Sequence, residues 1–263
     1  MILSDKRLFV FDMDGTLCLG ETVFPEAVTF INKLRKSGRK VLFFTNNASH
    51  TSPYYLTKLS RMGFDPREDE VMTAGDVTAV FLLEHRAGKS VYLLGTEELK
   101  RDFAERGILL RDDADIMVSS FDTSLTYDKL KHACDLVRSG AEFLCTHPDL
   151  NCPTEDGFIP DSGAIAALIT LCTGVEARYF GKPYEDTMKM ICEHTGVCVN
   201  ETVVFGDRLY TDIALGRRSG ACSVLVLTGE TDISGARGAE ENERPDYIFP
   251  SMKEICVEMF GTI

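Results

Sequence analysis

The sequence has no apolar run long enough to cross a bilayer. Its longer runs, such as residues 41–44 and 224–227, are far shorter than the roughly 20 residues that a transmembrane helix needs. Residues 1–7 carry charges of both signs and show neither the apolar stretch nor the small-residue cleavage site of a secretory signal. We therefore expect no membrane partner and a cytoplasmic location.

Metal-type cysteine and histidine patterns are also missing. The nine cysteines form no C-x-x-C pair and are scattered through apolar segments, which is typical of reduced thiols in a cytoplasmic protein. The five histidines lie far apart and form no H-E-x-x-H motif. These absences argue against a zinc site.

Basic residues are scarce relative to acidic ones. The chain has 28 Lys and Arg against 41 Asp and Glu, which gives a formal net charge of −13 at pH 7. A surface this acidic repels nucleic acid backbones and anionic lipid head groups, so neither is an expected partner. An anionic substrate would need a local cation to hold it against this field.

Short apolar runs alternate with segments of helical periodicity along the 263 residues. This alternation predicts βαβ units, and therefore an α/β fold with a doubly wound parallel sheet. The expected strands of this sheet are residues 8–11, 41–44, 202–205, 223–227 and 247–249, and the expected helices are residues 26–36, 53–61, 210–218 and 252–260.

The middle of the chain has strand and helix candidates of its own. The expected strands are residues 90–94, 116–119 and 142–145, and the expected helices are residues 97–106 and 127–138. We therefore predict a core domain formed by residues 1–79 and 180–263, with residues 80–179 inserted as a smaller α/β domain.

Two carboxylates separated by one residue follow the first expected strand, in the segment FVFDMDGT. Alternate residues of a strand share a face, so Asp12 and Asp14 point to the same side. Carboxylates this close repel each other unless a cation or a shared proton relieves them, and a hard divalent cation suits such a pair. A plain turn is the alternative, because Asp-Gly is a common turn sequence.

Polar residues also follow two other expected strands. Thr45 and Asn46 supply a hydroxyl and an amide that can hydrogen-bond a phosphate oxygen, although the same residues could simply precede a capped helix. Asp207 ends the strand at 202–205, and Asp212 lies five residues further on. Here too a helix cap is the alternative for Asp207.

Lys182, between a glycine and a proline, is a candidate for the cation that an anionic substrate needs. A lone lysine is usually a solvated surface residue, so its assignment depends on the other polar residues. Open α/β sheets bind ligands at the carboxyl ends of their strands, so one common site is expected. Carboxylates with one lysine, and without a Ser/His pair or a Walker lysine loop, suit Mg²⁺-assisted phosphoryl transfer through an aspartyl-phosphate.

Four segments resemble, in this order, the motifs of the haloacid dehalogenase (HAD) superfamily of phosphohydrolases: DMDGT, FTNN, GKP and GDRLYTD. The segments FTNNAS, GKPYEDT, GDRLYTDIALG and VLTGET are similar to the NagD-like, p-nitrophenyl-phosphatase type. In that type an α/β cap domain of class IIA is inserted between the second and third motifs. The resemblance implies a Rossmann-like HAD core with an inserted cap and an HAD-family phosphatase activity.

The resemblance implies catalytic roles for five residues. Asp12 would be the nucleophile that attacks phosphorus. Asp14 would protonate the leaving group and then activate water. Thr45, Asn46 and Lys182 would bind the transferring phosphoryl group, and Lys182 would also neutralise charge on the nucleophile.

The resemblance also implies a Mg²⁺ site. Asp12, Asp207 and the main-chain carbonyl of Asp14 would hold the metal ion, and Asp212 would support it. Asp14 also favours phosphate over halide as the leaving chemistry, because an alkoxide needs a proton and a halide does not.

We therefore expect a Mg²⁺-dependent phosphomonoesterase that acts on a small phosphorylated metabolite, with sugar phosphates and nucleoside monophosphates favoured. Three alternatives remain open: a phosphomutase, a protein phosphatase, and a binding module without turnover. A substantial cap domain disfavours the first two, and the presence of both Asp12 and Asp14 disfavours the third.

The inserted segment could also read the leaving group and pair two copies of the chain. Within residues 146–164, Asp149, Asn151 and Asp161 are candidates to bind sugar hydroxyls, or only to cap and turn. Related proteins often dimerise through their caps, so a homodimer is a candidate assembly. Residues 81–83 are an apolar group that could lie on such a surface or in the core.

Overall fold

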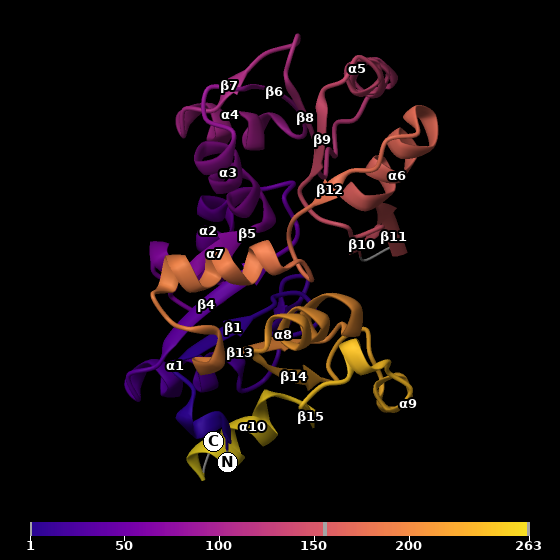
Figure 1. Ribbon diagram of the computed structural model, residues 1–263. Coiled ribbons are helices and arrows are strands. Elements are labelled where there is room, and N and C mark those ends of the chain that lie inside the picture. Colours follow the sequence, from indigo (N-terminus) through magenta and orange to yellow (C-terminus); the bar gives the residue numbers. More distant parts are fainter. Residues whose placement is uncertain (1, 155–156, 262–263) are drawn as a thin grey trace. The chain divides into compact units, whose positions relative to one another are not determined.

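A computed structural model describes residues 2–154 and 157–261 (Figure 1). The chain divides into two compact units. Unit 1 comprises Met1–Thr45, Tyr55–Met72 and Lys182–Ile263, and unit 2 comprises Asn46–Tyr54 and Thr73–Gly181. Among the described residues, no helix is both long and apolar enough to cross a membrane.

Unit 1 is built on a sheet with the strand order β15-β14-β13-β1-β4-β5. Its strands are β1 (Leu8–Phe11), β4 (Lys40–Thr45), β5 (Val71–Thr73), β13 (Thr202–Gly206), β14 (Cys222–Val226) and β15 (Tyr247–Phe249). Strand β1 pairs in parallel with both β4 and β13, so Phe11 lies opposite Phe43 and Phe205. Strands β13, β14 and β15 continue the parallel pairing.

Helices cover both faces of this sheet, as a doubly wound fold requires. The longer helices are α1 (Ala27–Lys36), α2 (Ser52–Arg61), α7 (Glu185–Thr195) and α10 (Met252–Phe260), and the shorter ones are α8 (Ala214–Ser219) and α9 (Ile233–Arg237). In Figure 1, α8 and α10 lie on opposite sides of β13 and β14. The predicted α/β fold class is confirmed.

Short elements complete unit 1. They are the hairpin β2 (Cys18–Leu19) and β3 (Thr22–Val23), the 3-10 helices η1 (Ile2–Asp5), η2 (Glu68–Glu70), η3 (Val199–Glu201) and η5 (Glu241–Glu243), and the π-helical turn η4 (Leu209–Ile213). The helix expected over residues 210–218 thus begins with a π turn and becomes α-helical only at Ala214.

Phenylalanine rings hold α1 against the centre of the unit 1 sheet. The rings of Phe11 and Phe205 stack with centroids 4.7 Å apart, and Phe30 of α1 meets Phe11 edge-on at 6.0 Å. All three side chains are fully buried. Aromatic pairs in these geometries add to the free energy of burial, so they fix β1 and β13 side by side.

Unit 2 has a second parallel sheet, with the order β12-β9-β8-β6-β7. Its strands are β6 (Ser90–Leu94), β7 (Leu109–Leu110), β8 (Ile116–Ser119), β9 (Glu142–Cys145) and β12 (Arg178–Tyr179). Its helices are α3 (Ala74–His85), α4 (Glu97–Glu105), α5 (Tyr127–Arg138) and α6 (Ser162–Thr173). Helices α5 and α6 pack together against one face, where they bury Met117 and Phe143.

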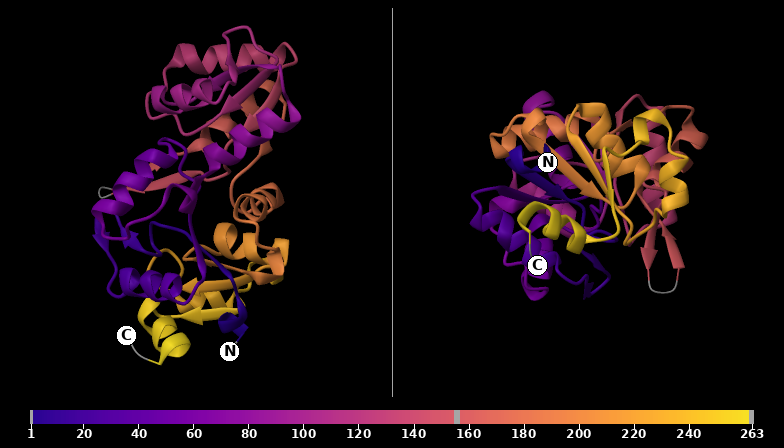
Figure 2. Two further views of the ribbon diagram at one scale, coloured as in Figure 1. Left: turned by 90° about the vertical axis from the view of Figure 1, so that its left-hand side faces the viewer. Right: turned by 90° about the horizontal axis from the view of Figure 1, so that it is seen from below.

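The polar segment 146–164 is more regular than its composition predicts. It contains the antiparallel hairpin of β10 (Asn151–Thr154) and β11 (Gly157–Pro160), which extends from unit 2 (Figure 2), and the start of α6. Asp161 caps α6 by accepting a hydrogen bond from the Ser162 amide. Residues 155 and 156 lie outside the described part of the segment.

Two further expectations concern the apolar group at residues 81–83 and the cysteines. Phe81 and Leu82 of α3 are buried, and Leu83 is half-exposed, so this apolar group lies mainly in the core. All nine cysteines lie among the described residues and are free thiols.

Candidate active site

Parallel pairing brings two of the motif aspartates to one edge of the unit 1 sheet. Asp12 directly follows β1, Asp207 directly follows β13, and the amide of Asp12 donates to the carbonyl of Phe205 at 3.0 Å. Asp212 of η4 joins them, because each of the three aspartates offers a carboxylate oxygen within 4.8 Å of the others. Residues 195 positions apart in the sequence therefore form one acidic cluster.

Lys182 is the cation of this cluster. Its Nζ lies 2.5 Å from Oδ1 of Asp12 and 2.7 Å from Oδ1 of Asp212, and it also donates to the carbonyl of Phe44 at 3.4 Å. Only 3% of its side chain is exposed. A buried ammonium is costly unless it is paired, so two carboxylates and a carbonyl explain how this lysine is held away from water.

Burial dominates the electrostatics of the cluster. Loss of water raises the pKa of Asp12 to about 8, although Lys182 acts to lower it and the neighbouring aspartates raise it further. Burial and the charge of Asp212 likewise raise the pKa of Asp207 to about 6. Burial acts to lower the pKa of Lys182, but Asp12 and Asp212 outweigh it and leave that pKa above its ordinary value.

Glycines let the backbone approach these carboxylates. A Cβ atom on Gly15, whose φ is +87°, would lie 2.3 Å from Oδ2 of Asp207, and one on Gly229 would lie 2.1 Å from the same oxygen. That oxygen accepts a hydrogen bond from the amide of Glu230 at 2.7 Å. A side chain at either glycine would therefore displace Asp207 from the cluster.

The donor set fits a divalent cation. Oδ1 of Asp207 is buried, and in the described part of the chain it meets no hydrogen-bond donor. Three converging carboxylates with one lysine carry excess negative charge, and a buried acceptor without a donor is costly. Hard oxygen ligands of this kind suit Mg²⁺ or Ca²⁺, and they do not suit a thiolate-preferring metal.

Asp14 has different surroundings from Asp12. Its side chain is 40% exposed, and its Oδ1 lies 3.7 Å from Nζ of Lys58 on α2. The thiol of Cys18 approaches the same oxygen at 3.8 Å, and burial, followed by the charge of Asp14, raises the pKa of Cys18 to about 12. Sequence reasoning missed Lys58, because a single lysine within an amphipathic helix carries no motif signal.

Thr45 and Asn46 lie at the end of β4 but belong to different units. Thr45 is the last residue of β4 and is buried in unit 1. Asn46 belongs to unit 2, where its Nδ2 donates to Oδ1 of Asp149 at 3.2 Å. The segment at Gly181 packs closely on Asn46, since a Cβ on Gly181 would lie 2.7 Å from its Oδ1.

Unit 2 contains a second group of possible metal ligands, formed by His147, Asp149 and Asp161. His147 is completely buried, and both of its ring nitrogens have partners: Oδ1 of Asp161 at 2.8 Å and the hydroxyl of Thr146 at 3.0 Å. These contacts hold the loop that carries Asp149. A structural role therefore accounts for His147 and Asp161.

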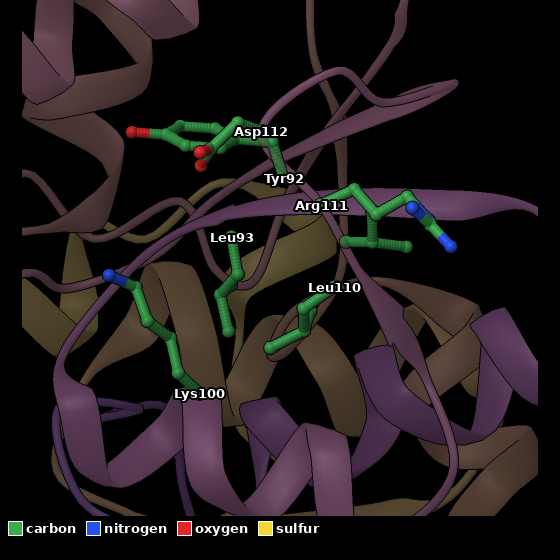
Figure 3. A pocket seen from close by; sticks show the side chains of 7 residues that line it. Tyr92, Leu93, Lys100, Leu110, Arg111 and Asp112 are labelled. Carbon is green, nitrogen blue, oxygen red and sulfur yellow. The ribbon is translucent and has the colours of Figure 1, made fainter.

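Unit 2 also contains a cavity of about 250 Å³ at the edge of its sheet that β7 forms (Figure 3). Its lining residues are Val91, Tyr92, Leu93, Lys100, Leu110, Arg111 and Asp112. None of the motif residues lines this cavity, so it is separate from the carboxylate cluster of unit 1.

Known proteins resemble the chain over nearly its whole length. A family model described as haloacid dehalogenase-like hydrolase matches residues 9–109, and a HAD-hydrolase-like model matches residues 179–255. An acid sugar phosphatase of Staphylococcus aureus is 33% identical over 259 residues, which cover 98% of this chain and 99% of the relative.

Two solved structures with the same fold are also phosphatases by name. The 4-nitrophenylphosphatase of Thermotoga maritima has a TM-score of 0.94 and 38% identity, and the match covers 98% of this chain and 99% of that one. The glycerol phosphate phosphatase of Mycobacterium tuberculosis, solved in complex with magnesium, has a TM-score of 0.90 and 29% identity. That match covers 97% of this chain and 77% of the other.

Proposed function

The chain belongs to the haloacid dehalogenase-like hydrolases, as its motifs predicted, and we propose that it hydrolyses sugar phosphates with the help of Mg²⁺. It is a phosphatase of the NagD-like, p-nitrophenyl-phosphatase type, and thus a phosphoric monoester hydrolase. The observation that carries the proposal is the contact of the buried Lys182 with Asp12 at 2.5 Å, inside a cluster of three carboxylates. A carboxylate held this way is shielded from water, yet has a cation beside it for an incoming phosphate.

In the first half of the reaction Asp12 is the nucleophile. One of its oxygens forms a bond to phosphorus, the bond from phosphorus to the sugar oxygen breaks, and its electron pair leaves with that oxygen. Asp14 gives its proton to the departing alkoxide. Lys182 offsets the repulsion between the negative charges of Asp12 and of the phosphoryl oxygens. This repulsion grows as the nucleophile approaches phosphorus.

In the second half water releases phosphate. Asp14, now a carboxylate, accepts a proton from the water molecule, whose oxygen forms a bond to phosphorus. The bond between phosphorus and Asp12 breaks, and its electron pair returns to the Asp12 carboxylate. Inorganic phosphate leaves, and both aspartates recover their starting protonation.

The same cluster would hold the cation. Asp12, Asp207 and the main-chain carbonyl of Asp14 are the proposed ligands of Mg²⁺, and Asp212 supports them through Lys182. When bound, Mg²⁺ supplies a Lewis acid that neutralises charge on the phosphoryl oxygens. Thr45 and Asn46 are proposed to donate hydrogen bonds to the same phosphoryl group.

Sugar phosphates are the proposed substrate class because of the relatives and of the chemistry in unit 2. The acid sugar phosphatase of S. aureus matches the chain over 98% of its length. Unit 2, proposed here as the cap domain, offers Asp149 and Asn151 as hydrogen-bonding side chains for sugar hydroxyls. Nucleoside monophosphates are the competing class.

A cytoplasmic homodimer is the proposed working form. The free thiols suit a reducing compartment. In unit 2, Leu171 of α6 is 87% exposed and Phe158 of β11 is 72% exposed, which is costly in water and favours burial against a second copy. Sedimentation of the wild type and of Leu171→Glu tests this, because the variant should be monomeric.

Phosphate release tests the function itself. Purified protein is offered a panel of sugar phosphates, nucleoside monophosphates and short phosphorylated acids, with Mg²⁺ or with EDTA. We expect the highest kcat/KM for a sugar phosphate, with no release in EDTA or in Asp12→Asn. No release from any substrate by folded protein would overturn the phosphatase proposal, and a nucleotide optimum would overturn only the substrate class.

A further inference from the structure

Lys58 of α2 is a largely buried cation that no motif includes. Its side chain is 13% exposed, and its Nζ lies 3.7 Å from Oδ1 of Asp14. Asp14 is the one acid within salt-bridge distance of Lys58 among the described residues. Lysine is rarely withdrawn from water unless it is paired, so the contact with Asp14 explains how Lys58 can be largely buried.

A second group from unit 1 approaches the same oxygen. The thiol of Cys18 lies 3.8 Å from Oδ1 of Asp14, and the backbone holds it there because the amide of Gly15 donates to the carbonyl of Cys18 at 2.7 Å. Within residues 2–154 and 157–261, Oδ2 of Asp14 makes no hydrogen bond and no ion pair. The carboxyl group therefore has polar partners on one oxygen, and its other oxygen is available to a substrate.

We propose that Lys58 is a positioning residue, which holds Oδ1 of Asp14 so that Oδ2 faces the leaving group. The inference deepens the proposed function and rests on it, because it concerns the proton transfer from Asp14. In that step the bond from Oδ2 to its proton breaks, the proton joins the departing sugar oxygen, and the pair from the broken phosphorus–oxygen bond stays on that oxygen.

Holding the carboxyl group has a kinetic effect because proton transfer is sensitive to distance. A donor must lie about 2.6–3.2 Å from the atom it serves, and a displacement of about 1 Å can cost about 100-fold in rate. Asp14 is 40% exposed, so burial alone does not fix the orientation of its carboxyl group. Lys58 and Cys18 supply that restraint from one side.

Two substrates with different leaving groups test the inference. A glycerol phosphate expels an alkoxide that needs a proton, whereas p-nitrophenyl phosphate expels a stable phenolate that does not. The ratio kcat/KM reports only the steps up to departure of the leaving group, so it isolates the first half-reaction. We expect Lys58→Met to lower kcat/KM for glycerol phosphate about 10- to 100-fold more than for p-nitrophenyl phosphate.

Three further variants make the test specific. Arg61→Met removes an exposed cation from the same helix and should leave both substrates unchanged. Lys58→Arg restores a cation near Asp14 and should recover much of the selective loss. Cys18→Ala should lower glycerol phosphate turnover selectively, but by less than Lys58→Met, and it keeps the test available if Lys58→Met does not fold.

The outcomes separate this inference from the proposed function. Equal losses for the two substrates, or no loss for either, would overturn the positioning role while leaving the phosphatase intact. A rise in KM for both substrates would assign Lys58 to phosphate binding and would also overturn it. A wild type that hydrolyses neither substrate would instead overturn the proposed function.

Discussion

Asp207→Asn should stabilise the protein in the absence of metal while abolishing its function. Asp207 is only 2% exposed, and burial together with Asp212 raises its pKa from the ordinary 3.8 to about 6. A tenfold change in a proton equilibrium is about 1.4 kcal/mol, so ionising Asp207 destabilises the folded, metal-free protein by about 3 kcal/mol. Asparagine removes that charge and can still accept the hydrogen bond from Glu230.

The sign of the pH dependence follows from the raised pKa. Because the folded protein holds this proton more tightly than the unfolded chain, the penalty is absent below about pH 4 and complete above about pH 6. The gain from Asp207→Asn should therefore be near zero at pH 4 and reach about 3 kcal/mol at pH 8, both measured in EDTA. With Mg²⁺ at pH 8 the wild type should recover its stability, and the variant should not respond.

Urea denaturation in EDTA and in Mg²⁺, at several pH values, measures these differences. Asp5→Asn is the matched control, because Asp5 is an exposed aspartate of the same unit. Its effect should be small at every pH. If Asp207→Asn is no more stable than the wild type in EDTA at pH 8, or if its gain does not change with pH, burial and the charge of Asp212 do not destabilise the ionised Asp207.

Three other substitutions have expected outcomes. Lys182→Met leaves Asp12 and Asp212 without their cation, so it should destabilise the metal-free protein by about 3–5 kcal/mol, measured in urea, and lower kcat about 100-fold or more. Small effects on both stability and kcat would contradict the role of Lys182. Asp149→Ala removes the acceptor of the Asn46 amide, so it should lower the free energy of unfolding by about 1 kcal/mol and raise KM about fivefold with kcat little changed. An unaltered KM would show that the hydrogen bond to Asn46 does not contribute to substrate binding. Phe205→Ala should cost about 3–5 kcal/mol of stability, with kcat per folded molecule retained, and loss of kcat would show that the core packing reaches the site.

Much of the site could be predicted because parallel strands bring their ends together. Asp12 and Asp207 follow strands that proved to be neighbours, β1 and β13, so their place after short apolar runs was enough to predict their proximity. Lys182 was inferred from the need for a local cation, and it does contact Asp12. Local pattern was equally effective for strands β6, β8 and β9, whose observed bounds match the expected ones.

The remaining features depend on contacts that leave no local pattern. Helix α3 was not predicted, because it is apolar on nearly all sides and lacks helical periodicity. Strands β7 and β12 have two residues each, too few for alternation. The contact from Asn46 to Asp149 joins residues 103 positions apart, so only the fold of unit 2 could place them together.

Lys58 illustrates the same limit within the site. It belongs to the amphipathic helix α2, SPYYLTKLSR. From the sequence, a single lysine in such a helix is expected on the solvated face, so nothing marks Lys58 as a neighbour of Asp14. The motif pattern predicts which residues react, but it does not predict which neighbours orient them. That second set becomes visible only when the distance from Lys58 to Asp14 is known.

Trapping the phosphoryl group during turnover shows directly whether Asp12 is the nucleophile. The protein is mixed with Mg²⁺ and a rapidly cleaved substrate such as p-nitrophenyl phosphate, quenched in acid within the first turnover, and digested for mass spectrometry. We expect phosphate on the peptide that contains Asp12, attached to Asp12 itself, and none in Asp12→Asn. Phosphate on another residue, or turnover by Asp12→Asn at the wild-type rate, would contradict it.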